Sequence, residues 1–240
     1  MKIDFVTLFP DMVLGALGHS IMSRAANAQI VTFGTVNPRD FTADKHRTVD
    51  DHPYGGGPGM VMMAEPIEKA LEAISAGPEA RDPQTVVVLT DPSGKVFRQR
   101  HARELCELER VVFVCGHYEG VDERVMTQLC THAFTIGDYV LTGGELPALV
   151  MADSIVRLLP GAIGDPSSHE DDSHEGGLLG HPLYTRPEVF RGERVPEELK
   201  SGDHAAIAQW RRRASLLRTR ANRPDLFVTA DLNSSDLDLS

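Results

Sequence analysis

The most informative segment of this chain is Ile136-Gly137-Asp138-Tyr139-Val140-Leu141-Thr142-Gly143-Gly144-Glu145-Leu146-Pro147. A strand-like apolar segment (133–136) precedes it, and a long apolar helical pattern (145–159) follows it. Glycine has no Cβ, so glycine residues allow the main chain itself to approach a ligand closely. We therefore expect a site walled by backbone N–H and C=O groups, which can recognise the edges of a purine. Side chains elsewhere must supply any acid–base chemistry.

Apolar runs alternate with helical patterns through the first two thirds of the chain. The apolar runs predict buried strands at 3–8, 30–36, 86–89, 111–115 and 133–136. Helical patterns lie between them, at about 10–26, 66–74, 98–108, 121–129 and 145–159. Alternation of this kind predicts an α/β fold, with a parallel sheet that carries helices on both faces.

The alternating pattern ends at Leu159-Pro160-Gly161. Residues 164–180 are polar, acidic and glycine-bearing, which is typical of a mobile linker. A helix is predicted from about Asp203, its N-cap, to Arg220. We therefore divide the chain into an α/β domain (1–162), a flexible linker (163–180) and a small helical C-terminal domain (181–240), and we expect the last dozen residues to be frayed.

Charge is distributed unevenly along the chain. The net charge of −11 opposes binding to nucleic acid, but residues 186–223 carry ten basic and five acidic side chains, a local charge of +5. Such a segment can form the basic face that a polyanion needs, although a solvated helix face is the alternative. The odd number of cysteines, with no CxxC spacing, predicts reduced thiols in a cytoplasmic protein. We expect no membrane span, because apolar runs of about 18 residues are absent from the sequence.

Glycines also follow other predicted strands. Gly116 and Gly120 lie just after the strand that ends at Cys115, and Gly94 closes the segment Thr90-Asp91-Pro92-Ser93-Gly94. Ligands of parallel sheets bind at the carboxyl ends of the strands, so we expect these two loops and residues 136–147 to line one pocket. The segment Tyr54-Gly55-Gly56-Gly57-Pro58-Gly59-Met60 is costly to order, which favours a binding loop over a flexible connector.

The linker supplies candidate general bases. A general base needs a carboxylate or imidazole that reaches the substrate proton, and the acids of the linker meet that need unless they only keep a loop solvated. They are Asp165, Glu170, Asp171, Asp172 and Glu175. The neighbouring histidines lack a known ligand spacing, so we predict no metal site. Arg157 stands in an apolar helix, where its charge needs a partner. It has either a functional role or a structural one in a salt bridge. Trp210, beside Arg211, either stacks on RNA or anchors a small helical core.

In these residues and their order, the chain resembles the bacterial tRNA (guanine-N1)-methyltransferase family of the SPOUT superfamily. The likeness covers about residues 1–227 and rests on several motifs. They are Lys45-His46-Arg47-Thr48-Val49-Asp50-Asp51, Pro53-Tyr54-Gly55-Gly56-Gly57-Pro58-Gly59-Met60, Gly116-His117-Tyr118-Glu119-Gly120, Ile136 to Pro147, Leu178-Leu179 and Tyr184-Thr185-Arg186-Pro187.

The resemblance implies a trefoil-knotted SPOUT domain that binds S-adenosylmethionine, and a homodimer whose active sites are shared between protomers. It implies methyl transfer to N1 of the guanine just 3′ of the anticodon in tRNA, with Asp172 and Arg157 as catalytic residues and Mg²⁺ as a further cofactor to test. The implied cofactor-binding positions are Pro92, Gly116, Glu119, Ile136, Gly137, Asp138, Tyr139, Val140, Leu141, Gly143 and Gly144. The positions assigned to tRNA binding are Gly57, Gly59, Ser173, Arg186, Arg211 and Arg218.

The chain also departs from the family pattern. The family usually has arginine where this chain has His117 and His52, so a role of arginine beside the cofactor glycine becomes pH-dependent here or is lost. Asp171 rivals Asp172 as the base, although the spacing to Leu178 favours Asp172. Two other functions stay open: a non-catalytic RNA-binding module with a vestigial cofactor pocket, and a methyltransferase that acts on another base or on a protein.

Overall fold

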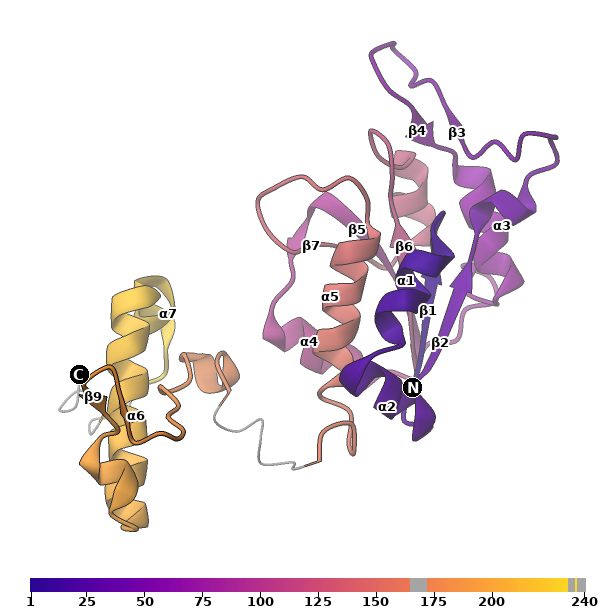
Figure 1. The fold of residues 1–240 in the computed structure, drawn as a ribbon. Coiled ribbons are helices and arrows are strands. Elements are labelled where there is room, and N and C mark those ends of the chain that lie inside the picture. The colour runs from indigo at the N-terminus through magenta and orange to yellow at the C-terminus, as the bar shows by residue number, and fades with distance from the viewer. Residues whose placement is uncertain (165–171, 233–235, 237–240) are drawn as a thin grey trace. The chain divides into compact units, whose positions relative to one another are not determined.

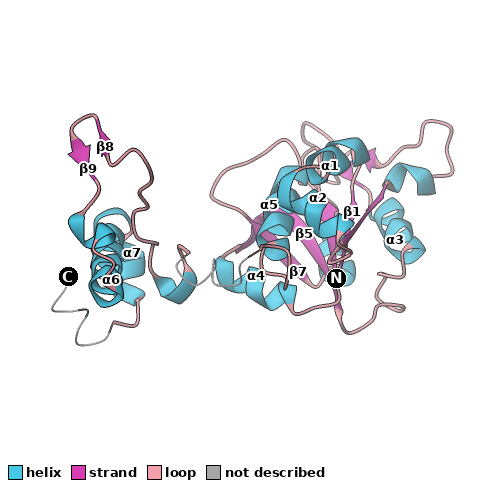
Figure 2. Cartoon of the chain, turned by 60° about the horizontal axis from the view of Figure 1, so that its bottom comes forward, coloured by secondary structure: helices cyan, strands magenta, loops and turns pink. Residues whose placement is uncertain are grey.

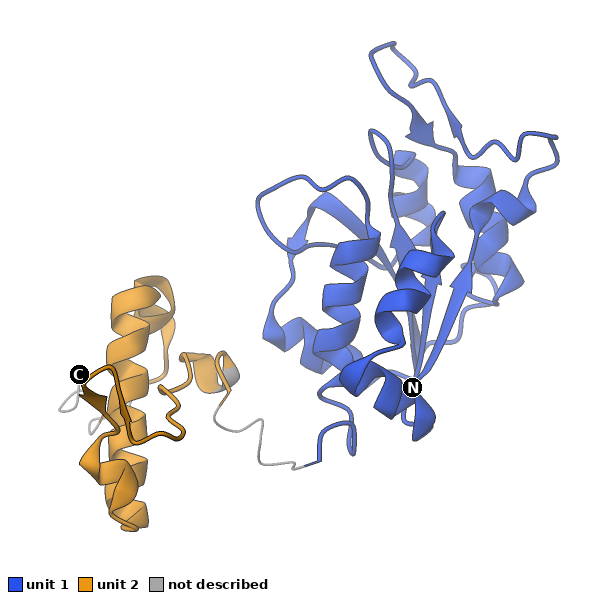
Figure 3. Ribbon diagram, viewed as in Figure 1, with its two compact units in different colours: residues 1–164 blue, residues 165–240 orange. Residues whose placement is uncertain are grey.

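A computed structural model describes residues 1–164, 172–232 and 236 of the chain. The chain divides into two compact units, residues 1–164 and residues 165–240 (Figure 3). Within the described part, none of the helices is both long enough and apolar enough to cross a bilayer.

The first unit is built on a five-stranded sheet with the order β2-β1-β6-β5-β7, and every pair of neighbours is parallel. All five strands fall where apolar runs predicted them. Their bounds are β1 Lys2–Val6, β2 Thr32–Val36, β5 Thr85–Val96, β6 Arg110–Cys115 and β7 His132–Thr135. The prediction of an α/β fold with a parallel sheet is therefore confirmed.

Each face of this sheet is covered by its own hydrophobic core. Successive side chains of a strand point to opposite faces, so Phe5 and Phe113 enter one core while Val6 and Val114 enter the other. The first core is closed by α1 Pro10–Leu17, α2 Ser20–Asn27, α4 Gln99–Cys106 and α5 Glu145–Val156. The second is closed by α3 Ala64–Ala73 and a π-helical turn, Val125–Leu129, and Figures 1 and 2 show α3 on the face of the sheet away from α5.

Three local predictions differ from the structure. The single helix predicted over 10–26 is wrong, because α1 ends at Leu17 and α2 starts at Ser20, whose φ of 53° cannot continue a helix. The helix predicted over 121–129 is only the short π-helical turn. Residues 90–94, predicted as a loop after a strand, lie within β5, whose pairing with β7 shifts register between Thr90 and Lys95.

An extended arm leaves the sheet between β2 and α3. It contains the 3₁₀ turn η1 Pro38–Phe41 and a minimal antiparallel ribbon formed by β3 Asp50–Asp51 and β4 Val61–Met62 (Figure 1). The sequence did not predict this ribbon, because strands of two residues leave no period to detect. The glycine cluster 54–60 forms the tip between β3 and β4.

The second unit consists mainly of α6 His204–Asn222 and α7 Pro224–Thr229, with a small ribbon formed by β8 Val189–Phe190 and β9 Glu193–Arg194 and 3₁₀ turns at Glu175–Gly177 and Glu197–Lys200. Asp203 caps α6 as predicted, because its carboxylate accepts from the backbone N–H groups of Ala205 and Ala206. The expectation of a frayed tail stays a prediction, because most of the last dozen residues lie outside the described ones, but Asp236 is described. Its buried carboxylate pairs with Arg212 through two bonds, at 2.7 and 2.6 Å.

Candidate functional site

A cleft lies at the carboxyl ends of β5, β6 and β7. Its empty volume is about 650 Å³, part of it open to solvent. Its lining residues are 90–92 within β5, 116–121 after β6, and 134–136 and 139–144 at and after the end of β7, together with Pro147 of α5. The prediction that these three segments line one pocket is therefore confirmed, although the first of them lies within β5 and its Gly94 is not a lining residue.

Close backbone packing forms the base of this cleft. The N–H of Gly144 donates to the carbonyl of Gly116 at 2.8 Å, and His117 forms an isolated antiparallel bridge with Gly143. A Cβ on Gly144 would lie 2.0 Å from Thr90 Oγ1 and 2.7 Å from the backbone N of Gly116. Only glycine lets these two loops approach so closely, which explains why glycines stand at these positions.

Buried polar groups lie directly beneath this wall. His117 Nε2 lies 2.8 Å from Oε2 of Glu145, and Thr7 Oγ1 donates to Oε1 of the same carboxylate at 2.7 Å. The neighbouring Cys115 is fully buried, and its burial, followed by the nearby Glu145 charge, raises the pKa of this thiol well above its usual range. Cys115 therefore stays protonated and cannot act as a thiolate nucleophile.

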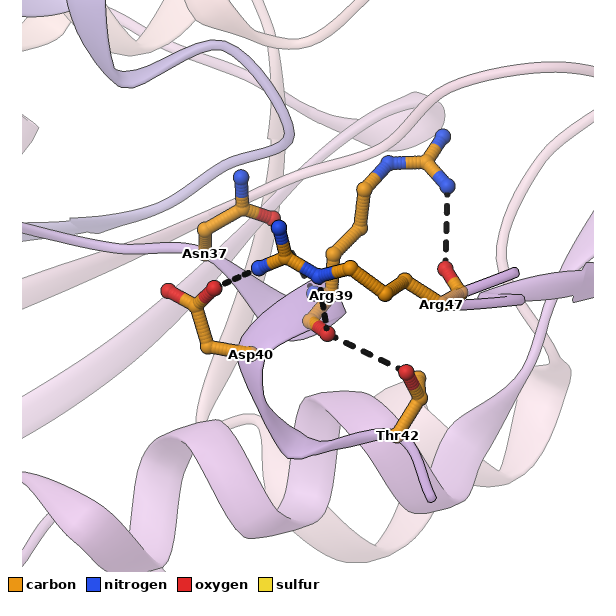
Figure 4. A network of polar contacts seen from close by, with 5 residues as sticks. All are labelled: Asn37, Arg39, Asp40, Thr42 and Arg47. Carbon is orange, nitrogen blue, oxygen red and sulfur yellow. Dashed lines mark hydrogen bonds and ion pairs between the residues drawn. The ribbon is translucent and has the colours of Figure 1, made fainter. Parts of the chain in front are cut away.

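The arm between β2 and α3 is tied to the outer wall of the cleft. Arg39 Nη1 donates to the carbonyl of Arg47 at 3.0 Å, while Arg47 Nε donates to the carbonyl of Arg39 at 3.2 Å (Figure 4). Arg47 also pairs with Asp40, and Thr42 donates to the Arg39 carbonyl at 3.1 Å. The second Nη of Arg39 donates to the hydroxyl of Tyr118, a cleft residue, at 3.0 Å. The arm thus supports the side chain of Tyr118, which flanks the cleft.

The glycine-rich tip of the arm reaches the same loop. Glu119 N–H donates to the carbonyl of Met60 at 2.9 Å, and a Cβ on Gly59 would lie 2.3 Å from Glu119 Cγ. Gly59, predicted to bind substrate, therefore packs against Glu119, predicted to bind the cofactor. Gly57 has open space around its Cα, and the neighbouring Tyr54 is fully exposed.

The predicted cofactor positions are mostly gathered at the cleft. Those that line it are Pro92, Gly116, Glu119, Ile136, Tyr139, Val140, Leu141, Gly143 and Gly144. Gly137 and Asp138 are not among the lining residues; the Gly137 carbonyl accepts bonds from Thr135 Oγ1 at 2.8 Å and from Tyr139 N at 2.9 Å, so it shapes the turn.

Sequence reasoning missed Thr7 and Glu145. Thr7 stands 138 residues before Glu145, and no local pattern links two such distant positions. The available signal was Glu145 itself, an acid at the start of a mostly apolar helix.

A second cavity lies in the unit that follows, with an empty volume of about 1090 Å³ that includes open solvent. Asp172 and Arg211 both line it, with residues 178–181 and the first half of α6. The chain after Asp172 is fixed to α6, because Thr219 Oγ1 accepts from Leu179 N–H at 2.9 Å and Ser215 donates to the Leu179 carbonyl. Asp172 therefore lies at the start of an anchored segment.

The remaining predicted residues are placed as follows. The Ser173 hydroxyl accepts from Gly180 N–H at 2.9 Å, and Arg218 Nη1 donates to the Gly180 carbonyl at 3.3 Å. Arg186 is exposed. Trp210 packs edge-on against His181 and Tyr184, which favours the core-anchor interpretation of this residue. Asp171, the rival base, lies outside the described residues, as do Asp165 and Glu170.

Arg157 is the C-cap of α5, whereas the cleft lies at the N-terminal end of this helix. A helix rises 1.5 Å per residue, so the 12 residues of α5 separate the two by about 18 Å. Arg157 therefore does not line this cleft.

Among the described residues, no three His, Cys, Asp or Glu side chains gather closely enough to hold a metal ion.

Comparison with known proteins gives one consistent result. A family model described as tRNA (Guanine-1)-methyltransferase TrmD matches residues 1–229. A tRNA (guanine-N(1)-)-methyltransferase of Staphylococcus haemolyticus is 51% identical over 236 residues, which cover 98% of this chain and 94% of that protein. A protein of the same name from Bacillus velezensis is 52% identical over 227 residues, which cover 95% of this chain and 92% of that protein.

Proposed function

Because the chain belongs to the tRNA (guanine-1)-methyltransferase family, we propose that it transfers a methyl group from S-adenosylmethionine to N1 of the guanine just 3′ of the anticodon in tRNA. The observation that carries this proposal is the extent of the match. It spans residues 1–229 and so includes the cleft, Asp172 and the basic helix α6.

The cleft fits the proposed methyl donor. Its walls combine backbone polar groups with the side chains of Tyr139, Val140 and Leu141, a mixture of polar and apolar groups that is typical of small-molecule sites. Gly116, Gly143 and Gly144 would let the main chain contact the donor, and Glu119 would stand at its edge. When bound, S-adenosylmethionine supplies an electrophilic methyl group. The trefoil knot belongs to the same proposal, since the family resemblance implies it.

Asp172 is the proposed general base. Guanine N1 carries a proton and is a poor nucleophile until that proton is removed. Removal by a positioned carboxylate typically accelerates a reaction by about 10²–10⁴-fold. A hydrogen bond from Leu179 N–H to Thr219 of α6 and one from Gly180 N–H to Ser173 support this role, because they order the segment after Asp172. Asp172 itself lines a cavity that Arg211 also lines. Alignment of the guanine with the methyl group contributes more, about 7–11 kcal/mol.

The exposed arginines of α6 are proposed to bind tRNA. Arg211, Arg213, Arg218 and Arg220 are exposed along this helix. Arg212, between two of them, pairs with Asp236. Cations on a helix bind phosphates without regard to sequence, so they position the tRNA while the active site selects the base. Arg186, before the helix, is exposed as well.

The proposed homodimer rests on an apolar surface of the first unit. Phe9 and Met12 at α1, Val140 in the cleft loop, and Leu146 and Val150 on α5 are large apolar side chains with between 45% and 81% of their surface exposed. Figure 1 shows α1 and α5 side by side on one face of the sheet. Monomeric proteins rarely expose large apolar patches, so this surface fits a second copy of the chain.

The stripe along α5 indicates how two copies would share their sites. Leu146, Val150, Asp153 and Arg157 follow one another at spacings of four, three and four residues, which places them on one helix face. In a two-fold contact each residue pair occurs twice, so packing of this stripe against itself pairs Val150 with Asp153 and Leu146 with Arg157. Arg157 of the partner subunit would then lie near the N-terminus of α5, beside the cleft. There it could offset negative charge that develops on the guanine.

Methyl transfer to unmodified tRNA tests the proposal. Purified protein is incubated with labelled S-adenosylmethionine and the tRNA, and the labelled nucleotide is mapped. We expect N1-methylguanine just 3′ of the anticodon. Asp172→Asn should lower the turnover about 10²–10⁴-fold without changing donor affinity, whereas Asp231→Asn, which alters an exposed acid of the same unit, should leave both unchanged.

Two results would contradict the proposal. Binding of tRNA without transfer would indicate a non-catalytic RNA-binding module. A label on another base or on a protein would indicate a different methyltransferase.

A further inference from the structure

Glu145 is a buried acid that the proposed chemistry does not use. Its side chain is 2% exposed and stands in the first turn of α5, at the edge of the first hydrophobic core. An acid is costly to bury unless hydrogen bonds compensate its lost hydration. The hydrogen-bond partners of Glu145 therefore explain how its burial is tolerated.

The carboxylate joins three elements. Oε1 accepts from Thr7 Oγ1 just after β1, and Oε2 contacts His117 Nε2 just after β6. Thr7 Oγ1 in turn accepts from Phe9 N–H at 2.9 Å, and the Phe9 ring lies 4.8 Å from the His117 ring. The imidazole is thus fixed by a hydrogen bond at one nitrogen and by a tilted contact with the Phe9 ring.

This assembly supports the wall of the cleft from behind. His117 itself lines the cleft, and its backbone bridges to Gly143. A Cβ on Gly143 would lie 2.2 Å from His117 Nε2 and 2.7 Å from Glu145 Oε2. The loop that carries the proposed donor-binding residues therefore packs directly on the His117–Glu145 pair.

We propose that Glu145 is a positioning residue for methyl-donor binding, which it serves by holding His117 and the loop around Gly143 in place. The inference rests on the proposed function, since it assumes that the cleft binds S-adenosylmethionine. Glu145 touches neither donor nor guanine in this role. It acts through His117 and Gly143, so its loss should weaken donor binding while the site for tRNA on α6 stays intact.

Donor affinity measured by calorimetry on the full chain tests this role. Glu145→Ala should raise the Kd for S-adenosylmethionine about tenfold, as expected when a charge-assisted bond that orders the wall is lost. The KM for the donor should rise in parallel, and the KM for tRNA should not. Glu145→Gln should restore the affinity to within about threefold, because its amide still accepts from Thr7 and can donate to a neutral imidazole. Thr7→Val, which removes the hydroxyl that donates to Glu145 and accepts from Phe9 N–H, should give an intermediate loss.

A second buried acid provides the matched control. Asp4, on β1, is 2% exposed and pairs with Arg110 at 2.5 Å, but it does not line the cleft. Asp4→Asn should lower the melting temperature and leave the donor Kd unchanged. If folded Glu145→Ala binds the donor as tightly as wild type does, the inference is overturned. The same holds if Asp4→Asn weakens donor binding equally, since the effect would then follow from stability alone. A wild-type protein that fails to bind the donor would instead refute the proposed function.

Discussion

At the scale of single residues, the cleft depends on glycines whose missing Cβ atoms let two loops meet. We expect Gly144→Ala to abolish donor binding, since its Cβ would collide with Thr90 Oγ1 and with the backbone of residues 115 and 116. Overpacking of this kind typically costs about 1–3 kcal/mol in unfolding free energy. Calorimetry with S-adenosylmethionine and thermal melting measure the two effects.

Gly15 is the matched control for that substitution. It lies in α1, and nothing stands within 4 Å of the place its Cβ would take. Gly15→Ala should therefore leave donor affinity unchanged and should stabilise the helix by up to about 1 kcal/mol. Normal donor binding by Gly144→Ala would show that the close approach of the two loops is not needed.

Residues differ in how well the sequence reveals them. Gly116, Gly143 and Gly144 could be predicted, because clustered glycines after apolar runs form a local signal. The Thr7–Glu145 contact could not, since it joins positions at opposite ends of the first unit and depends on the sheet order β1-β6-β5. The role of Asp172 was predicted only through family resemblance, because acids in a polar segment carry no distinguishing pattern.

At the scale of elements, α6 supports the segment that carries the proposed base. Thr219 is fully buried; its hydroxyl accepts from Leu179 N–H and donates to the Ser215 carbonyl at 2.7 Å. Thr219→Val would leave the Leu179 N–H without this acceptor, which typically costs about 1–3 kcal/mol. We expect a lower turnover number with unchanged donor affinity, measured by steady-state kinetics and calorimetry.

Thr229 provides the comparison for this threonine. It is exposed at the end of α7, and its hydroxyl donates to the carbonyls of Asp225 and Leu226 in the same helix. Thr229→Val should leave turnover unchanged. Equal turnover in the two variants would mean that anchorage of residues 173–180 to α6 does not matter for catalysis.

Helices and strands could be predicted where their apolar pattern extends over many residues. The five strands and most helices of the first unit follow from buried apolar runs and helical periods, and Asp203 was identified as the cap of α6. Interruptions of helices and shifts of strand register were harder to predict. The interruption at Ser20 depends on one residue with positive φ, and the shift within β5 depends on Gly94, whose Cβ would lie 2.6 Å from the backbone of Ala133. Such features arise from tertiary packing, which local periodicity does not record.

At the scale of the whole molecule, the separation of Arg157 from the cleft makes dimerisation a requirement for the proposed reaction. We expect Val150→Glu to produce a monomer, because each two-fold contact would bury two new carboxylates opposite Asp153 of the partner subunit. Like charges at an interface cost several kcal/mol. Turnover should fall at least about 100-fold, since the misplacement of one catalytic group can cost that much. Light scattering and methyl transfer to tRNA measure both outcomes.

Val228 gives the matched control for this variant, since it is another exposed valine, at 83%, and lies on α7 in the second unit. Val228→Glu should stay dimeric and active. Donor binding separates the two explanations for an inactive Val150→Glu protein, because the cleft is built from a single subunit and should keep its affinity in a folded monomer. A monomer with full turnover would contradict shared active sites and would require Arg157 to act far from the methyl group.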